Sequence, residues 1–210
     1  MGNEVGAITG PGTTGLPGFW LAKHPVSQAQ WQAVMGNNPS QRGRGNSHPV
    51  DSVSWEDASA FCRKAGLRLP LEAEWEHACR AGTASPFALG EGAYLNSQMA
   101  NFNGDFPGGS GAGAFKWLFR TRTTEAGSFP PNVWGFHDMH GQLWEWCDDK
   151  VEGGARALRG GSWNDLGGYA ASGARVGLAP GFRDGIIGFR PCPSSTGKAV
   201  KERSRRQGKE

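Results

Sequence analysis

Residues 53–83 read VSWEDASAFCRKAGLRLPLEAEWEHACRAGT, and this stretch decides the class of fold. Ser54 is suited to cap a helix, and Asp57 stands three residues later in the position of a capping box. Apolar residues then recur at helical spacing until Gly66, the residue type that most often ends a helix. Pro70 sets up another helix directly afterwards. The stretch therefore predicts two consecutive short helices.

The sequence on either side of this stretch sets the order of the elements. Upstream, FWLAKHPVS (residues 19–27) predicts a strand that enters a helix capped by Ser27. From about Gly90 the helical pattern disappears, and loop signals alternate with short strand segments in residues 127–149 and 157–163. Short helices first and short strands later favour an α+β fold over a sheet built from βαβ units.

The composition indicates a folded chain that is rich in loops. Of its 210 residues, 34 are Gly and 13 are Pro, and both residue types mark turns and loops. Nine Trp and 11 Phe argue against disorder, because disordered sequences are poor in aromatic residues. No apolar run approaches the roughly 18 residues that a membrane span needs. The length predicts one domain with a sizeable core, and the lack of a long apolar run predicts no membrane span.

The two ends of the chain differ from the middle. Residues 1–17 lack the basic start and apolar segment of a secretory signal, and we expect a flexible lead there. Residues 194–210 contain six Lys or Arg and two Glu, which predicts a disordered basic tail; contact with an acidic partner is the alternative. The folded domain is expected over residues 18–193. We expect a cytoplasmic protein, with a surface or phage-particle location as the alternative.

Four blocks in this order resemble one known family. They are residues 53–83, PNVWGFHDMHGQLWEWCDD (131–149), LRGGSW (158–163) and GFR (188–190). Together they are similar to the domain of the formylglycine-generating, sulfatase-modifying enzymes, a branch of the C-type lectin-like fold. The resemblance covers nearly the whole chain and implies a few short helices, short antiparallel strands and many loops.

The enzymes of this family hold copper between two Cys thiolates that follow the RGGS strand, because soft thiolates suit Cu(I). The corresponding stretch here, residues 163–190, contains no Cys. Asp165 and Ala170 stand about where the thiolates are expected. The resemblance therefore implies a protein without formylglycine-generating activity, and a sulfatase-modifying-type oxidoreductase with altered chemistry is the alternative.

Residues 159–190, here called the C-terminal segment, resemble part of another class with this fold, the variable proteins of diversity-generating retroelements. In that class a reverse transcriptase mutates adenines in the coding copy of the segment, so AAY codons for Asn are scattered to other residues. The positions between them stay fixed. The resemblance assigns these framework positions to Arg159, Gly160, Gly161, Ser162, Trp163, Ser172, Arg175, Pro180, Arg183, Ile187, Gly188, Phe189 and Arg190.

The other positions that match an Asn in an unmutated copy are the candidate variable residues. They are Asn164, Asp165, Leu166, Tyr169, Ala174, Val176, Leu178, Phe182, Asp184, Gly185 and Ile186, with Ala179 as a weaker candidate. Mutation of the first two bases of AAY cannot give Lys, Glu, Gln, Met or Trp. None of these types occurs between Asn164 and Arg190, which agrees with the assignment.

The candidate variable residues mix aromatic, aliphatic and acidic side chains, as binding surfaces do. The resemblance therefore implies a non-enzymatic, receptor-like protein that binds a protein or glycan ligand. Two other interpretations stay open. The Leu, Val and Ile residues of the segment belong to the core in one of them, and the chain is a plain interaction module in the other.

Several polar residues are candidates for metal binding. The resemblance suggests structural calcium at Glu145, although Gln142 replaces the usual Asn of that motif, and a second calcium site would begin at Asn101. No other cofactor is expected. His137 and His140 are candidate ligands too, but without a third ligand we interpret them as turn residues.

The remaining notable side chains are expected to be structural. Trp144 and Trp146 share one strand face and predict core packing. The acids of residues 72–76 lie at a helix start, where the helix dipole favours them. The family resemblance suggests a disulfide between Cys62 and Cys192, but Pro191 shifts the register, so two buried thiols are the equal alternative.

Overall fold

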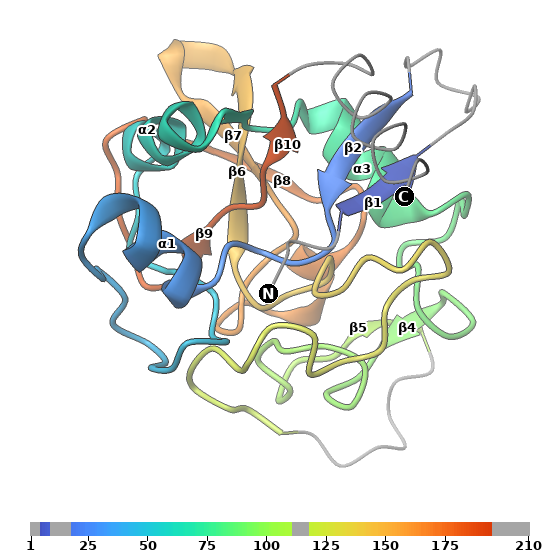
Figure 1. Ribbon diagram of the computed structural model, residues 1–210. Coiled ribbons are helices and arrows are strands. Elements are labelled where there is room, and N and C mark those ends of the chain that lie inside the picture. Colours follow the sequence, from blue (N-terminus) through green and yellow to red (C-terminus); the bar gives the residue numbers. More distant parts are fainter. Residues whose placement is uncertain (1–4, 9–17, 111–117, 195–210) are drawn as a thin grey trace, which may run out of the picture.

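The computed structural model describes residues 5–8, 18–110 and 118–194 (Figure 1). Its α-helices are α1 (Gln28–Met35), α2 (Trp55–Ala65) and α3 (Glu72–Arg80), and two 3-10 helices are η2 (Glu152–Gly154) and η3 (Gly167–Ala170). Its strands are β1 (Val5–Ile8), β2 (Phe19–Ala22), β3 (Leu67–Arg68), β4 (Tyr94–Leu95), β5 (Gly108–Gly109), β6 (Trp144–Lys150), β7 (Arg156–Arg159), β8 (Arg175–Leu178), β9 (Ile187–Gly188) and β10 (Cys192–Pro193). The predicted α+β class is confirmed.

The helix boundaries follow from local capping. The Ser54 side chain accepts from the backbone of Asp57, and the Asp57 carboxylate accepts from the backbone of Ser54, which completes the predicted capping box of α2. Ser27 caps α1 in the same way. The third helix, α3, ends at Ala81, a non-glycine residue that adopts the left-handed conformation directly before Gly82.

A four-stranded sheet in the order β8-β7-β6-β9 forms the centre of the molecule (Figure 1). The pairs β6–β7 and β7–β8 are antiparallel, as expected. The pair β6–β9 is parallel, with Trp144 opposite Ile187 and Glu145 opposite Gly188, and so departs from the all-antiparallel expectation. Because β7 and β9 flank β6, the two ends of the C-terminal segment lie on either side of one strand.

The predicted flexible lead is corrected in one part. Residues 5–8 form β1, which pairs antiparallel with β2 from Val5 opposite Ala22 to Ile8 opposite Phe19. The open edge of β2 supplies the hydrogen-bonding partner for this strand. Residues 1–4 and 9–17 of the lead, and 195–210 of the predicted basic tail, lie outside the described residues.

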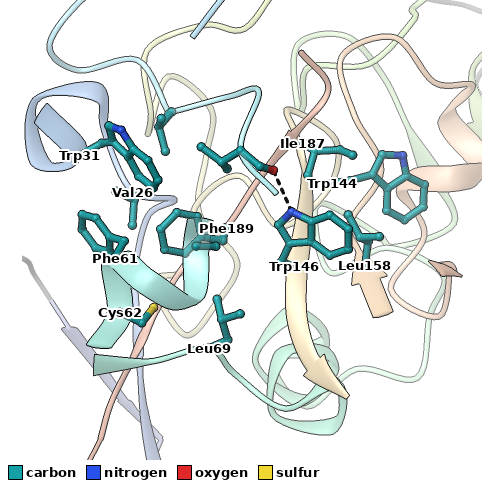
Figure 2. Packing of buried hydrophobic residues seen from close by; sticks show 13 residues of the cluster. Val26, Trp31, Phe61, Cys62, Leu69, Trp144, Trp146, Leu158, Ile187 and Phe189 are labelled. Carbon is teal, nitrogen blue, oxygen red and sulfur yellow. Dashed lines mark hydrogen bonds between the residues drawn. The ribbon is translucent and has the colours of Figure 1, made fainter. Parts of the chain in front are cut away.

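Two apolar clusters cover the two faces of the central sheet. Trp144, Trp146 and Leu158 pack with residues of α1 and α2 on one face, as Figure 2 shows, and the Trp146 indole donates to the Val53 carbonyl at 3.0 Å. Cys147 packs with α3 and β2 on the other face. The core interpretation of the two tryptophans is therefore confirmed.

The structure also answers two questions that the sequence left open. All four Cys are buried free thiols, including Cys62 on α2 and Cys192 on β10, so the thiol alternative holds. No helix in the described part of the chain is long and apolar enough to cross a membrane.

Candidate functional site

Arg159, at the end of β7, holds the start of the C-terminal segment. Its side chain is only 1% exposed and donates to the carboxylates of Glu72, at 2.9 Å, and Glu76, both on α3. It also donates to the Ser172 carbonyl. Without the two carboxylates the Arg159 charge would be buried and uncompensated, which is costly. Arg159 therefore ties β7, α3 and the middle of the segment together.

Arg190 holds the end of the segment. It is completely buried and forms two hydrogen bonds with the Glu145 carboxylate on β6, at 2.7 and 2.9 Å. Its remaining donors reach the carbonyl groups of Ala22, Lys23 and His137. The framework arginines at the two ends are thus among the largest fully buried side chains of the described residues.

The framework glycines stand where a side chain does not fit. Gly161 has φ +73°, and a Cβ there would lie 2.7 Å from the Tyr169 carbonyl oxygen. A Cβ on Gly188 would lie 2.6 Å from the Val50 carbonyl oxygen. Close backbone approach at both ends therefore requires glycine.

Trp163 connects the beginning of the segment to its end. Its indole N–H donates to the Gly185 carbonyl at 3.1 Å. Its ring stacks on Phe119, with centroids 6.2 Å apart, and the Arg42 guanidinium lies 5.7 Å from its centroid. The loops that carry candidate variable residues are consequently joined beneath the surface.

Four of the eleven candidate variable residues are exposed, and most of the others are half-buried. Leu166, Tyr169 and Phe182 are 45%, 50% and 44% exposed, and Asn164 is exposed as well. The next six are half-buried: Asp165, Ala174, Val176, Leu178, Asp184 and Ile186. The three large apolar side chains that are 44–50% exposed are candidates for contact with a ligand.

Part of the segment contributes to the interior. Val176 and Leu178 of β8, together with Ile186, pack against the main apolar cluster from its edge. Gly185 is buried, and a Cβ there would lie 2.4 Å from Cγ of Arg42. The expectation of an exposed surface is therefore wrong at Gly185, which is buried. It holds only in part at the three aliphatic residues, which are half-buried because they cover the core.

The surface extends beyond the segment to residues that the sequence did not suggest. The Gly167 N–H donates to the Phe106 carbonyl at 2.8 Å, which places Phe106 beside Leu166. A Cβ on Gly104 would lie 2.7 Å from the backbone of Leu118, so Leu118 lies next to the loop that carries Phe106. Phe106 and Leu118 are 55% and 51% exposed. In the sequence, only the position of Phe106 inside a glycine-rich loop could have indicated this part of the surface.

Two framework arginines in the middle of the segment are exposed. Arg183 forms a bidentate pair with Asp57 of α2 at 2.7 and 3.0 Å, and Arg175 lies 3.7 Å from Glu72 of α3. Burial opposes ionisation of Asp57, but hydrogen bonds from Arg183 and Ser54 outweigh it and lower the pKa of this carboxyl. These pairs attach the middle of the segment to both helices.

The residues around Glu145 do not fit the calcium site that the resemblance suggests. One carboxylate oxygen accepts from the Trp75 indole at 2.7 Å, and both accept from Arg190, whose charge would repel a cation there. The Asn101 amide donates to Gln142 at 2.8 Å and to the Arg122 carbonyl. Among the described residues, no group of three or more His, Cys, Asp or Glu is placed to hold a metal ion.

The two candidate histidines have structural partners. Nδ1 of His140 lies 2.7 Å from the Ala170 carbonyl oxygen, and Nε2 accepts from the Ala88 N–H at 3.0 Å. Burial lowers the pKa of His140 to about 4, so the ring is neutral at pH 7. His137 bonds the Phe129 carbonyl through Nδ1 at 2.9 Å. The turn interpretation therefore accounts for both.

A copper site with two thiolates does not fit the segment either. Asp165 caps the backbone N–H of Ser162, and Ala170 is buried, at the two positions where thiolates were expected. The thiols of the chain lie elsewhere, and burial raises the pKa of Cys62, Cys79 and Cys192 to about 12.

Residues 1–193 match the sulfatase-modifying factor enzyme 1-like domain. The chain belongs to this family. Within the family it is 40% identical over 135 residues to the formylglycine-generating enzyme of Mus musculus, a match that covers 62% of this chain and 34% of the relative. It is 32% identical over 194 residues to the inactive C-alpha-formylglycine-generating enzyme 2 of Bos taurus, covering 88% and 61%.

The chain is thus similar to one relative that is named as an enzyme and to another that is named as inactive. The chain spans between about a third and three fifths of the length of these two relatives. Among solved structures it is similar to variable protein 1 of Treponema denticola, with a TM-score of 0.66, 26% identity and coverage of 84% of this chain and 85% of that one. The predicted lectin-like fold and the predicted resemblance to variable proteins are confirmed.

Proposed function

We propose that the chain is a non-enzymatic ligand-binding protein whose C-terminal segment is diversified by a retroelement. One observation carries the proposal. The framework residues at both ends of the segment are buried and tied to the core, whereas Leu166, Tyr169 and Phe182 point outward between them. This division lets exposed side chains change while the backbone beneath them stays in place.

The exposed residues have the chemistry of a binding surface. Aromatic and aliphatic anchors dominate interface energetics, and Tyr169, Phe182 and Leu166 supply both kinds. Half-buried Asp165 and Asp184 add polar specificity. Because buried bonds of Arg159 and Arg190 fix the segment before a ligand arrives, little ordering cost opposes binding. A protein or glycan ligand suits such a surface.

The likeness to variable protein 1 of Treponema denticola supports this function, since the match covers most of both chains. The inactive relative from Bos taurus supports a role without catalysis. The likeness to the enzyme of Mus musculus favours the second candidate, a sulfatase-modifying-type oxidoreductase. Incubation with copper and a Cys peptide of the sulfatase type separates the two. We expect no aldehyde, and its formation would overturn the non-enzymatic proposal.

The DNA beside the gene tests diversification. We expect a near-copy of the codons for residues 159–190, close to a reverse-transcriptase gene. That copy should carry AAY at positions such as Leu166, Tyr169 and Phe182, and should match the gene at Arg159 and Arg190. A locus with neither the copy nor the reverse transcriptase would refute diversification while leaving ligand binding to be measured directly.

A further inference from the structure

A groove of about 410 Å³ lies between two loops outside the C-terminal segment. Its walls are formed by Gly43, Arg44, His48, Arg122, Thr123, Thr124 and Glu125. Arg44 and Arg122 are both exposed, and they face a space large enough for one or two acidic side chains. None of the functions proposed above uses these residues.

The first loop of the groove is held in place by a buried amide. The Gln28 side chain is 3% exposed, donates to the Gly43 carbonyl at 2.6 Å and accepts from the Gly45 N–H at 3.4 Å. A Cβ on Gly43 would lie 2.1 Å from Oγ1 of Thr123, so the two loops approach as closely as glycine permits. The backbone that carries Arg44 is therefore fixed.

The second loop is held by another buried amide. Gln142 accepts from the Thr124 N–H at 3.1 Å and donates to the Thr124 carbonyl at 3.0 Å. The Asn101 amide donates to the Arg122 carbonyl at 2.9 Å. A groove built from two anchored loops is preformed, which reduces the cost of ordering it around a ligand.

Arg44 and Arg122 differ from the other arginines of the described residues. Seven arginines form ion pairs with carboxylates: Arg68, Arg80, Arg156, Arg159, Arg175, Arg183 and Arg190. Three more have other partners: Arg42 lies over Trp163, Arg63 bonds Ser59 and Arg120 bonds the Ser97 carbonyl. Within the described part of the chain, Arg44 and Arg122 are the two guanidinium groups with neither kind of partner, and both line this groove.

We propose that this groove binds carboxylate groups on the surface of an acidic partner protein. Two guanidinium groups suit carboxylates, which they bind through paired hydrogen bonds. A nucleic acid suits the groove less, because its closely spaced phosphates need a longer basic track, and Glu125 adds a negative charge to the wall. Bases would also find no Phe, Tyr or Trp on the walls to stack upon.

The groove adjoins the C-terminal segment without being part of it. Arg42, next to Gly43, lies over the Trp163 ring, and the backbone N–H of Trp163 donates to the Gln142 carbonyl at 3.1 Å. A partner that seats an acidic side chain in the groove thus lies beside the candidate variable residues. The proposal stands independently of retroelement diversification, because it rests on residues outside 159–190.

Binding of a fluorescein-labelled hexaglutamate peptide to the full chain tests the proposal, with hexaglutamine as the uncharged control. The test variant is Arg44→Gln/Arg122→Gln. The matched control is Arg203→Gln/Arg205→Gln in the basic tail, which removes the same charge from the sequence. Fluorescence anisotropy gives the affinities, and amide chemical shifts show where the peptide binds. A thermal melt checks that each variant is folded.

We expect the groove variant to lose about tenfold or more in affinity, and the tail variant to change less than about threefold. Peptide-dependent shifts should centre on residues 43–45 and 122–125. An equal loss in both variants, or a loss in the tail variant alone, would overturn the proposal. Tighter, Arg122-dependent binding of a six-nucleotide oligo-dT would overturn the choice of a protein partner.

Discussion

Arg190 and Glu145 show how much of the framework depends on single residues. The pair is completely buried, and each charge is stabilised chiefly by the other. Buried pairs of this kind contribute little net stability compared with apolar substitutes, but removal of one partner is severe. The framework arginine is thus constrained by a glutamate 45 residues away in the sequence.

Substitution of this arginine should destabilise the fold strongly. We expect Arg190→Gln to lower the free energy of unfolding by about 3–5 kcal/mol, because the Glu145 carboxylate loses its buried counter-charge. Arg183→Gln is the matched control, since its pair with Asp57 is half-exposed, and it should cost less than about 1 kcal/mol. Urea titrations measure both. Equal losses would contradict the assignment.

Asp138 and His140 have opposite effects on stability as the pH changes. Burial raises the pKa of Asp138 to about 6 and lowers that of His140 to about 4. Folded Asp138 holds its proton more tightly than in the unfolded chain, so stability falls as pH rises from 4 to 6. His140 holds its proton less tightly when folded, so stability falls as pH drops from 6.5 to 4.

Removal of Asp138 should therefore expose the response of His140. Between pH 6.5 and 4 the two effects oppose each other in the parent protein. Asp138→Asn keeps the acceptor for the Gly127 N–H but abolishes the acid titration. We expect the variant to lose about 2 kcal/mol more than the parent as pH falls through this window. Urea midpoints at several pH values measure this, and parallel profiles would refute it.

At the level of elements, Arg159 joins β7, α3 and the loop at Ser172. The acids of α3 were interpreted from sequence as partners of the helix dipole. Glu72 and Glu76 also bind this arginine, whereas Glu74 binds Arg68. The carboxylates at the start of α3 thus position the segment as well as stabilise the helix.

Arg159→Met should loosen the packing of α3 on β7. We expect a loss of about 1–3 kcal/mol, because Glu72, Glu76 and the Ser172 carbonyl all lose hydrogen bonds from the buried guanidinium. Arg175→Met is a control that faces the same Glu72 carboxylate from a more exposed side chain, at 3.7 Å, and should cost under about 1 kcal/mol. Thermal unfolding measures both, and a stable Arg159→Met protein would contradict the assigned role.

The sequence predicted elements whose determinants are local. Ser54 and Asp57 specify the start of α2 within four residues, and Gly66 specifies its end, so no tertiary information was needed. The parallel pairing of β6 with β9 joins residues more than 40 positions apart. Neither strand carries a signal for that partner, and β9 is only two residues long.

The candidate site was predictable to a similar extent. The resemblance assigned the framework positions, but it did not separate exposed Leu166 from half-buried Leu178, since both are Leu in one irregular segment. Burial there depends on whether β8 lies against the core, which is a tertiary property. The groove at Arg44 and Arg122 escaped sequence analysis because its two loops are far apart in the chain.

At the level of the whole molecule, a buried framework and an exposed surface come from the same 32-residue segment. Its ends flank β6 and are fixed by buried arginines, while its middle crosses the outside of the sheet and carries the large exposed side chains. We infer that these exposed residues are interchangeable without loss of the fold. Stability should therefore depend on the framework and not on the surface.

Thermal unfolding of one combined variant tests this claim most directly. Leu166→Asn/Tyr169→Asn/Phe182→Asn introduces, at three exposed positions, the residue that the proposed diversification expects in an unmutated copy. We predict a Tm within about 5 °C of the parent, because exposed substitutions each change stability by about 0.5 kcal/mol or less. Arg190→Gln, measured beside it, should melt about 10 °C lower. A triple variant that melts as low as Arg190→Gln would show that the exposed residues, and not the framework alone, hold the fold.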